Sequence, residues 1–219
     1  MTANQFTNLV YVVSRCGDVS VIDGKTNAVR TTINVDESPW SISVNPLTNR
    51  AYVTKQHDNT VAVIDIKTNK VIHFIPVGID PNVVSVNPST NVVYVTNYGN
   101  RSVSVINSTT NSVITTIPVG NSPRDISVNP STNMVYVANS NDNSVTVIDG
   151  KTNKVIDIRR GSPVPPTVFP GIPVGRGPDG LSVNPSTNMV YVANYDDTDH
   201  STGLVEIRLF PLLMAQQTK

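Results

Sequence analysis

Apolar and polar residues alternate along short segments of the chain, with the period of two that is typical of β-strands. In one such segment Ile126 and Val128 flank Ser127, and Pro130 ends the segment because proline lacks a backbone donor. Turns that contain Asn or Gly separate the segments that follow. The pattern predicts four short antiparallel strands, here called A to D, over 125–129, 134–138, 144–149 and 154–158.

This four-strand pattern is repeated along the chain. The phrase NPSTNVVYVTN at 87–97 returns as NPSTNMVYVAN at 129–139 and at 184–194, with a looser copy at 45–55. The tyrosines of the phrase follow one another at offsets of 41, 42, 42 and 55 residues, and they are Tyr11, Tyr52, Tyr94, Tyr136 and Tyr191. Such a period is typical of propeller blades or solenoid coils. We expect the last four of these tyrosines to lie partly buried between units, each with a hydrogen-bond partner for its hydroxyl.

Strands with Val and Ile on both faces need cover on both sides, which neighbouring units can provide. We therefore predict an all-β chain, a β-propeller of four-stranded antiparallel blades, in preference to a linear β-solenoid. We expect about four and a half blades in a single domain, 1–219, incomplete at both ends and with strand A absent from the first copy. The repeat units span about 4–44, 45–86, 87–128, 129–183 and 184–219. The open blade edges predict self-association, or completion of the ring by residues outside this sequence.

A proline-rich insertion at 159–171 lengthens the fourth unit by 13 residues. One interpretation is a recognition arm that exposes Val168 and Phe169. The other, which we favour, is a tolerated surface loop, because longer loops cost little free energy.

Charge and cysteine content exclude several classes of function. Lys and Arg together number 16, as do Asp and Glu, so no net charge attracts nucleic acid. No stretch approaches the length of a membrane span, and we expect no membrane insertion. The single Cys16 cannot form an internal disulfide, and no ligand spacing indicates a zinc site.

Residues 94–97 spell YVTN, and the segments around them, SVNPSTNxVYVxN, NSVTVIDxxTN and VIxTIPVG, extend the likeness over nearly the whole chain. In these motifs the sequence resembles the YVTN β-propeller repeat family, which includes archaeal surface-layer propellers and YncE-like periplasmic proteins. The resemblance implies a scaffold whose task varies. It also implies an extracellular, cell-surface or periplasmic location, which the residues themselves do not indicate.

Candidate binding residues lie where the copies differ while the framework repeats. In a propeller the D–A and B–C loops emerge on the same face, so their variable positions are candidates for a binding surface. After the proline of each D–A loop these positions are Trp40, Asn82, Arg124 and Asp179, and in the B–C loops they are Arg15, His57, Tyr98, Asp142 and Tyr195. Free drift of loop residues is the alternative interpretation. Trp40 is the strongest candidate because the only tryptophan is expected in an exposed loop.

Metal binding has weak support in the sequence. A longer B–C loop at 195–203 carries Asp196, Asp197, Asp199 and His200, which could bind a divalent cation such as Ca²⁺, but their spacing lacks the glycine and terminal glutamate of a calcium loop. We expect no other cofactor.

Three functional hypotheses remain open. The favoured one is a non-enzymatic binding or scaffold module for protein or glycan contacts at a cell surface. The second is a propeller enzyme of lyase or lactonase type, with an axial cation held by Asp125, Asp179 and Asn82, although the sequence contains no known catalytic motif. The third is a truncated fragment without independent activity.

Overall fold

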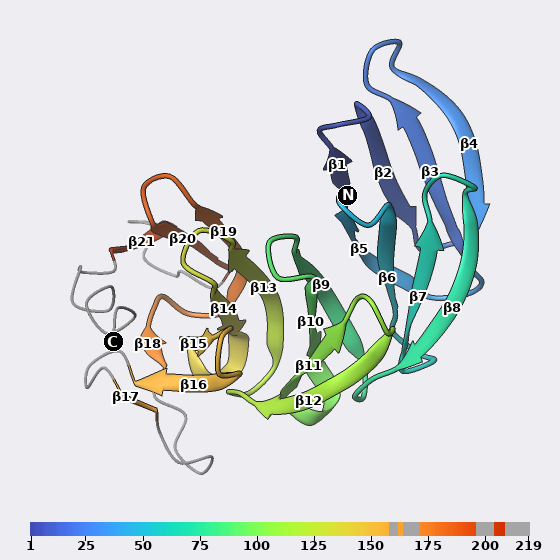
Figure 1. The fold of residues 1–219 in the computed structure, drawn as a ribbon. Helices are drawn as coiled ribbons and strands as arrows, with labels where there is room; N and C mark the ends of the chain where they lie inside the picture. Colours follow the sequence, from blue (N-terminus) through green and yellow to red (C-terminus); the bar gives the residue numbers. More distant parts are fainter. Residues whose placement is uncertain (158–161, 164–170, 196–203, 209–219) are drawn as a thin grey trace. The chain divides into compact units, whose positions relative to one another are not determined.

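A computed structural model describes residues 1–157, 162–163, 171–195 and 204–208 (Figure 1). The chain divides into two compact units, Met1–Thr116 and Ile117–Lys219. Most of the insertion 159–171, with Val168 and Phe169, lies outside the described residues. The same holds for all four candidate metal ligands of the last B–C loop, Asp196, Asp197, Asp199 and His200.

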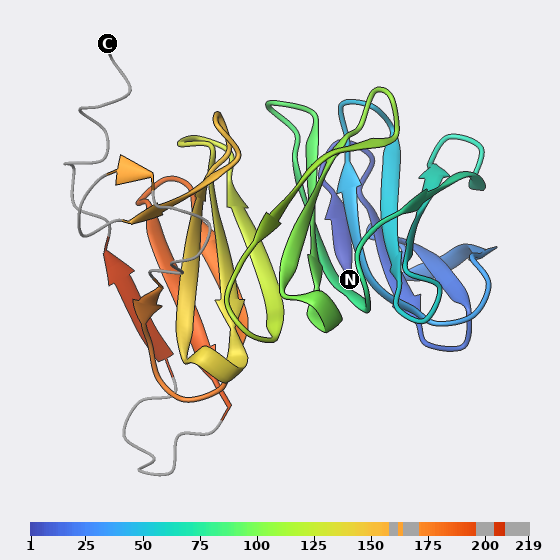
Figure 2. The same cartoon turned by 90° about the horizontal axis from the view of Figure 1, so that it is seen from below.

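The first unit contains three antiparallel sheets, each with its strands in sequence order and joined by short hairpins (Figures 1 and 2). The first sheet consists of β1 (Thr2–Asn4), β2 (Leu9–Ser14), β3 (Asp18–Asp23) and β4 (Ala28–Asn34). The second consists of β5 (Pro39–Asn45), β6 (Arg50–Lys55), β7 (Thr60–Asp65) and β8 (Lys70–Pro76). The third consists of β9 (Pro81–Asn87), β10 (Val92–Asn97), β11 (Ser102–Asn107) and β12 (Ser112–Pro118), and the unit boundary falls within β12.

The second unit contains two sheets. One includes β13 (Pro123–Asn129), β14 (Met134–Asn139), β15 (Ser144–Asp149), β16 (Lys154–Asp157), β17 (Ser162–Pro163) and β18 (Ile172–Pro173). The other includes β19 (Pro178–Asn184), β20 (Met189–Asn194) and β21 (Leu204–Arg208). Two single-turn 3-10 helices, η1 (Tyr98–Asn100) and η2 (Ser140–Asp142), lie in B–C loops. Within the described ranges, no helix has the length and apolar character needed to cross a membrane.

The first sheet has an inner strand that we did not expect. Strand β1 pairs with β2 in an antiparallel register in which Thr2 lies opposite Tyr11 and Asn4 lies opposite Leu9. The expectation that strand A is absent from the first copy is therefore wrong. Three residues are enough to form this strand, because the pairing with β2 satisfies their backbone groups without a full-length repeat.

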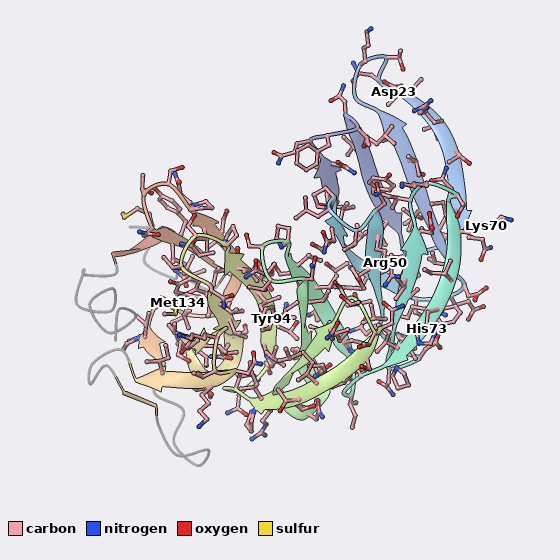
Figure 3. The ribbon with its side chains drawn as sticks, in the orientation of Figure 1. Asp23, Arg50, Lys70, His73, Tyr94 and Met134 are labelled. Carbon is pink, nitrogen blue, oxygen red and sulfur yellow. The ribbon has the colours of Figure 1, made fainter. Side chains whose placement is uncertain are left out.

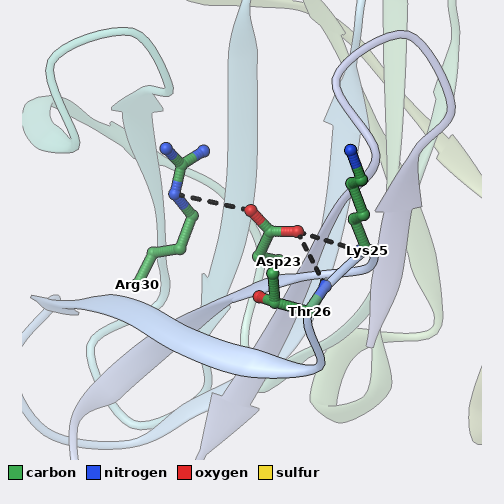
Figure 4. A network of polar contacts seen from close by, with 4 residues as sticks. All are labelled: Asp23, Lys25, Thr26 and Arg30. Atoms are coloured by element: carbon green, nitrogen blue, oxygen red, sulfur yellow. Dashed lines mark hydrogen bonds and ion pairs between the residues drawn. The ribbon is translucent and has the colours of Figure 1, made fainter.

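Hairpin turns are built in the same way throughout. In the turn after β3, the Asp23 carboxylate accepts hydrogen bonds from the backbone N–H groups of Lys25 (2.8 Å) and Thr26 (3.2 Å), and Arg30 lies 3.8 Å from it (Figure 4). The Lys25 N–H contributes most to lowering the pKa of Asp23. Asn27 completes the turn in the left-handed region, with φ of 56°. Asparagine tolerates this conformation better than most side chains.

The recurring Thr-Asn of the sequence follows from this turn geometry. The equivalent asparagine of the described hairpin turns has a positive φ at Asn8, Asn27, Asn49, Asn69, Asn91, Asn111, Asn133, Asn153 and Asn188. Since side chains that branch at Cβ are strained at positive φ, the turn itself accounts for the repeated asparagine.

The repeated tyrosines form the centre of the packing. Tyr52, Tyr94 and Tyr136 are each 0% exposed, more deeply buried than we expected, whereas Tyr191 is half-buried (Tyr94 is labelled in Figure 3). The Tyr52 hydroxyl donates to the Ser108 carbonyl oxygen at 3.4 Å. The Tyr136 hydroxyl has no hydrogen-bond partner among the described residues, and burial raises its pKa. The prediction of a partner for every hydroxyl is thus wrong at Tyr136.

Candidate functional site

The four D–A candidate residues lie in strands and not in loops. Each is the second residue of an inner strand: Trp40 in β5, Asn82 in β9, Arg124 in β13 and Asp179 in β19. The strand pairing shifts in register at this point in all four strands, as in a β-bulge. A bulge changes the direction of the side chain that it carries. A residue inside a strand can therefore point toward the loops at the end of the sheet. The expectation that Trp40 lies in a loop is therefore wrong, although its side chain is exposed.

Backbone hydrogen bonds hold the D–A and B–C loops together at the same end of the sheets. In the first unit, the Val35 N–H donates to the Gly17 carbonyl oxygen at 2.9 Å, and the Gln56 N–H donates to that of Ser38 at 3.0 Å. In the second unit, the Ser140 N–H donates to the Ser122 carbonyl oxygen at 3.0 Å. Within each unit these hydrogen bonds therefore place D–A and B–C loops side by side.

Three of the candidates meet in a cavity of about 220 Å³ in the first unit. The Arg15 guanidinium carbon lies 4.1 Å from the centroid of the Trp40 ring, a cation–π contact. Trp40 remains 38% exposed and His57 is exposed. The cavity is lined by Arg15, Ser38, Pro39, Trp40, Gln56 and His57.

A buried lysine lies directly before the lining residues Gln56 and His57. Lys55 is only 4% exposed, and its ammonium pairs with the Asp58 carboxylate and lies 4.0 Å from that of Asp36. At the same place in their sheets, β10 and β14 have Asn97 and Asn139. The lysine balances part of the charge of two acids in the loops around the cavity, whereas no ion pair of Arg15 occurs among the described residues.

Three other candidates meet in the second unit, in a cavity of about 330 Å³ lined by Arg124, Ser140, Asp179 and Tyr195. Arg124 donates to the Asp179 carboxylate at 3.0 Å, with both side chains about half exposed. Tyr195 is 86% exposed. The cation of this cavity is already paired, so the cavity differs from that of Trp40 in the charge that it offers to a ligand.

The remaining candidates have roles in holding the loops. Asn82 is only 8% exposed, which contradicts its expected place on an open binding face, and its carbonyl oxygen accepts a hydrogen bond from the Thr54 hydroxyl at 2.6 Å. Asp142 accepts two 2.7 Å hydrogen bonds from Asn121, one from the backbone and one from the side chain. Tyr98 lies in η1, half-buried, and its N–H donates to the Asp80 carbonyl oxygen at 2.9 Å.

Asp125 links two strands of the second unit. Its carboxylate accepts hydrogen bonds from the Leu181 N–H of β19 at 2.6 Å and from the Ile126 N–H at 2.8 Å. Burial raises the pKa of Asp125 to about 6, and the Asp179 charge adds to the rise. Among the described residues, no group of three His, Cys, Asp or Glu side chains could hold a metal ion.

Sequence comparison between copies missed Ser38, Gln56 and Ser140, which also line the two cavities. Gln56 directly precedes His57 in its B–C loop, so the polar run Gln56–Asn59 was the available signal. The sequence signal at Ser38 was weaker, since serine is common in loops. Its positive φ of 65° becomes visible only in the structure.

Comparison with known proteins supports the fold. A family model described as "Lactonase, 7-bladed beta-propeller" matches residues 80–169, less than half of the chain. The fold is an incomplete β-propeller. Among solved structures, hydrazine synthase of Kuenenia stuttgartiensis is similar at a TM-score of 0.73 and 19% identity, over 84% of this chain and 52% of that one. The present chain therefore spans about half of that protein chain, and at this identity the likeness concerns the fold alone. No curated protein matches the sequence significantly.

Proposed function

We propose that this chain is a non-enzymatic binding module that recognises a sugar residue of a glycan through the cavity around Trp40. The observation that carries the proposal is the contact of Arg15 with Trp40 at the rim of that cavity. An indole that is held in place by a cation and still 38% exposed offers a rigid apolar surface to a ligand.

The lining has the chemistry that a sugar needs. Arg15 supplies hydrogen-bond donors, Gln56 supplies both a donor and an acceptor group, and Ser38 supplies a hydroxyl. Specific sites combine an apolar surface with a few polar groups of this kind. The small volume, about 220 Å³, suits a single sugar ring. A protein partner would need about 800 Å² of surface on each side, which this cavity alone does not provide.

The test uses the only tryptophan of the chain as its reporter. The whole chain is first applied to a glycan array. Each glycan that binds it is then titrated into the chain in solution while Trp40 emission is followed. We expect a saturable change in emission, and we expect Trp40→Ala to abolish retention while the far-UV circular dichroism is unchanged. Tyr195→Ala is the matched control, because it removes an exposed aromatic from the other cavity. Equal loss in both variants, retention of no glycan, or unfolding of Trp40→Ala would contradict the proposal.

A second candidate function is hydrolysis of a lactone, which the family-model match over 80–169 favours. In that reaction water adds to the carbonyl carbon, the ring C–O bond breaks, and the new carboxylic acid releases a proton at neutral pH. A panel of lactones with a pH indicator measures this proton. Acceleration by the wild-type chain that Asp179→Ala abolishes, together with a Ca²⁺-dependent thermal stabilisation lost in the same variant, would favour the enzyme.

A further inference from the structure

The charges around Trp40 distinguish one class of sugar from the rest. We infer that the Trp40 cavity is selective for a sugar that bears a carboxylate, a uronic or sialic acid, and that Arg15 is the residue that reads this charge. The inference rests on the proposed glycan binding and names the ligand class of the same site.

Arg15 can bind an anion more readily than Arg124, the cation of the other cavity. Its guanidinium lies over the Trp40 ring, and no acidic partner is found for it in the described part of the chain. Arg124, in the other cavity, is bonded to Asp179. A guanidinium presents paired N–H donors in a plane, which match the two oxygens of a carboxylate. A cation already positioned by an aromatic ring loses less conformational entropy when it binds.

The buried Lys55 makes this charge effective. Asp36 and Asp58 belong to the loops around the cavity, and both would repel an anionic ligand. The Lys55 ammonium lies next to both carboxylates and balances part of their charge. Its near-complete burial, with 4% exposed, limits the screening of its charge by solvent, whereas the side chains of Asp36 and Asp58 are 70% and 45% exposed. Glu37, an exposed neighbour of Ser38, is the acid of these loops that no ion pair among the described residues compensates.

The experiment compares each acidic sugar with its neutral methyl ester. Glucuronic, galacturonic and sialic acids are titrated against the whole chain, each beside its methyl ester, with Trp40 emission as the readout. We expect at least one acid to bind about tenfold more tightly than its ester. One additional charge-assisted hydrogen bond changes the affinity by about this factor. We expect this preference to weaken as salt is raised, because the ligand charge is partly screened.

Variants separate charge recognition from folding. Arg15→Ala should remove the preference, so that acid and ester bind equally, with a larger loss for the acid than for the ester, whereas Arg124→Ala, the matched control, should leave binding of both unchanged. Glu37→Gln should tighten binding of the acid and not of the ester, because it removes a like charge. Equal binding of acid and ester by the wild-type chain would overturn the inference and leave the proposed glycan binding intact. Binding of no sugar, acid or ester, would overturn both, and tight binding of acidic peptides with no sugar bound would assign the cavity to a protein partner.

Discussion

The carboxyl group of Asp125 should make the stability of the second unit fall as pH rises. Asp125 in β13 accepts a 2.6 Å hydrogen bond from the Leu181 N–H of β19 and so links two neighbouring sheets. In the first unit, Ser41 has the same place in β5, and its hydroxyl lies 3.5 Å from the Val84 N–H of the next inner strand. The second unit thus has an ionisable group where the first has a neutral one. Asp125→Asn removes the charge and keeps an oxygen that can accept the hydrogen bond.

The magnitude follows from the shifted pKa. The usual value of 3.8 rises to about 6 in the folded chain, chiefly through burial. The folded state therefore binds the proton more tightly than the unfolded state does. The stabilisation is fully present below pH 3.8 and is lost as pH rises through about 6. A rise of about two pKa units corresponds to about 3 kcal/mol.

The assay is urea unfolding of wild type and Asp125→Asn between pH 4 and pH 8, followed by far-UV circular dichroism. The stability of the variant relative to wild type should increase by up to about 3 kcal/mol over this range, most of it between pH 4 and pH 6.5. Trp40 lies in the first unit, so its fluorescence shows whether the effect is confined to the second unit. Asp142→Asn is the control, since Asp142 ends η2 and the residue at the same place in η1 is Asn100. A difference that does not change with pH, or that decreases, would refute the assignment of a raised pKa to Asp125.

Three further changes test the packing and the turns. Tyr94→Ala should lower the free energy of unfolding by about 3 to 5 kcal/mol, because a fully buried aromatic is removed; a loss below about 1 kcal/mol in urea melts would place Tyr94 outside the core. Tyr136→Phe should leave stability unchanged or raise it by about 1 kcal/mol, because the buried hydroxyl lacks a partner among the described residues; a clear loss in thermal melts would show that the hydroxyl is bonded. Asn133→Ala should cost about 1 to 2 kcal/mol at a φ of 57°, whereas Asn133→Gly should cost less; equal losses in chemical denaturation would contradict the role of the left-handed turn.

The sequence alone determines the strands, the turns and the repeat. Each depends on residues close together in the chain: Ile126 and Val128 alternate with Ser127, and Asn133 takes the left-handed conformation that ends the turn. Local periodicity and local backbone sterics act before any tertiary contact is made, so they can be read without a structure. We wrongly expected strand A to be absent from the first copy. Residues 2–4 do not match the repeat sequence, yet they pair with β2 as strand β1.

The tertiary structure alone decides which of the repeated positions form a site. Trp40 and Asn82 occupy the same place in their strands, yet Trp40 is 38% exposed over a cavity and Asn82 is 8% exposed. Arg15 reaches Trp40 from the B–C loop of the preceding sheet. Contacts of this kind join residues far apart in the chain, and their geometry depends on bulges and on the packing of neighbouring sheets. Equivalent sequence positions therefore predict a common backbone, whereas the chemistry at each position depends on the neighbours that the fold brings to it.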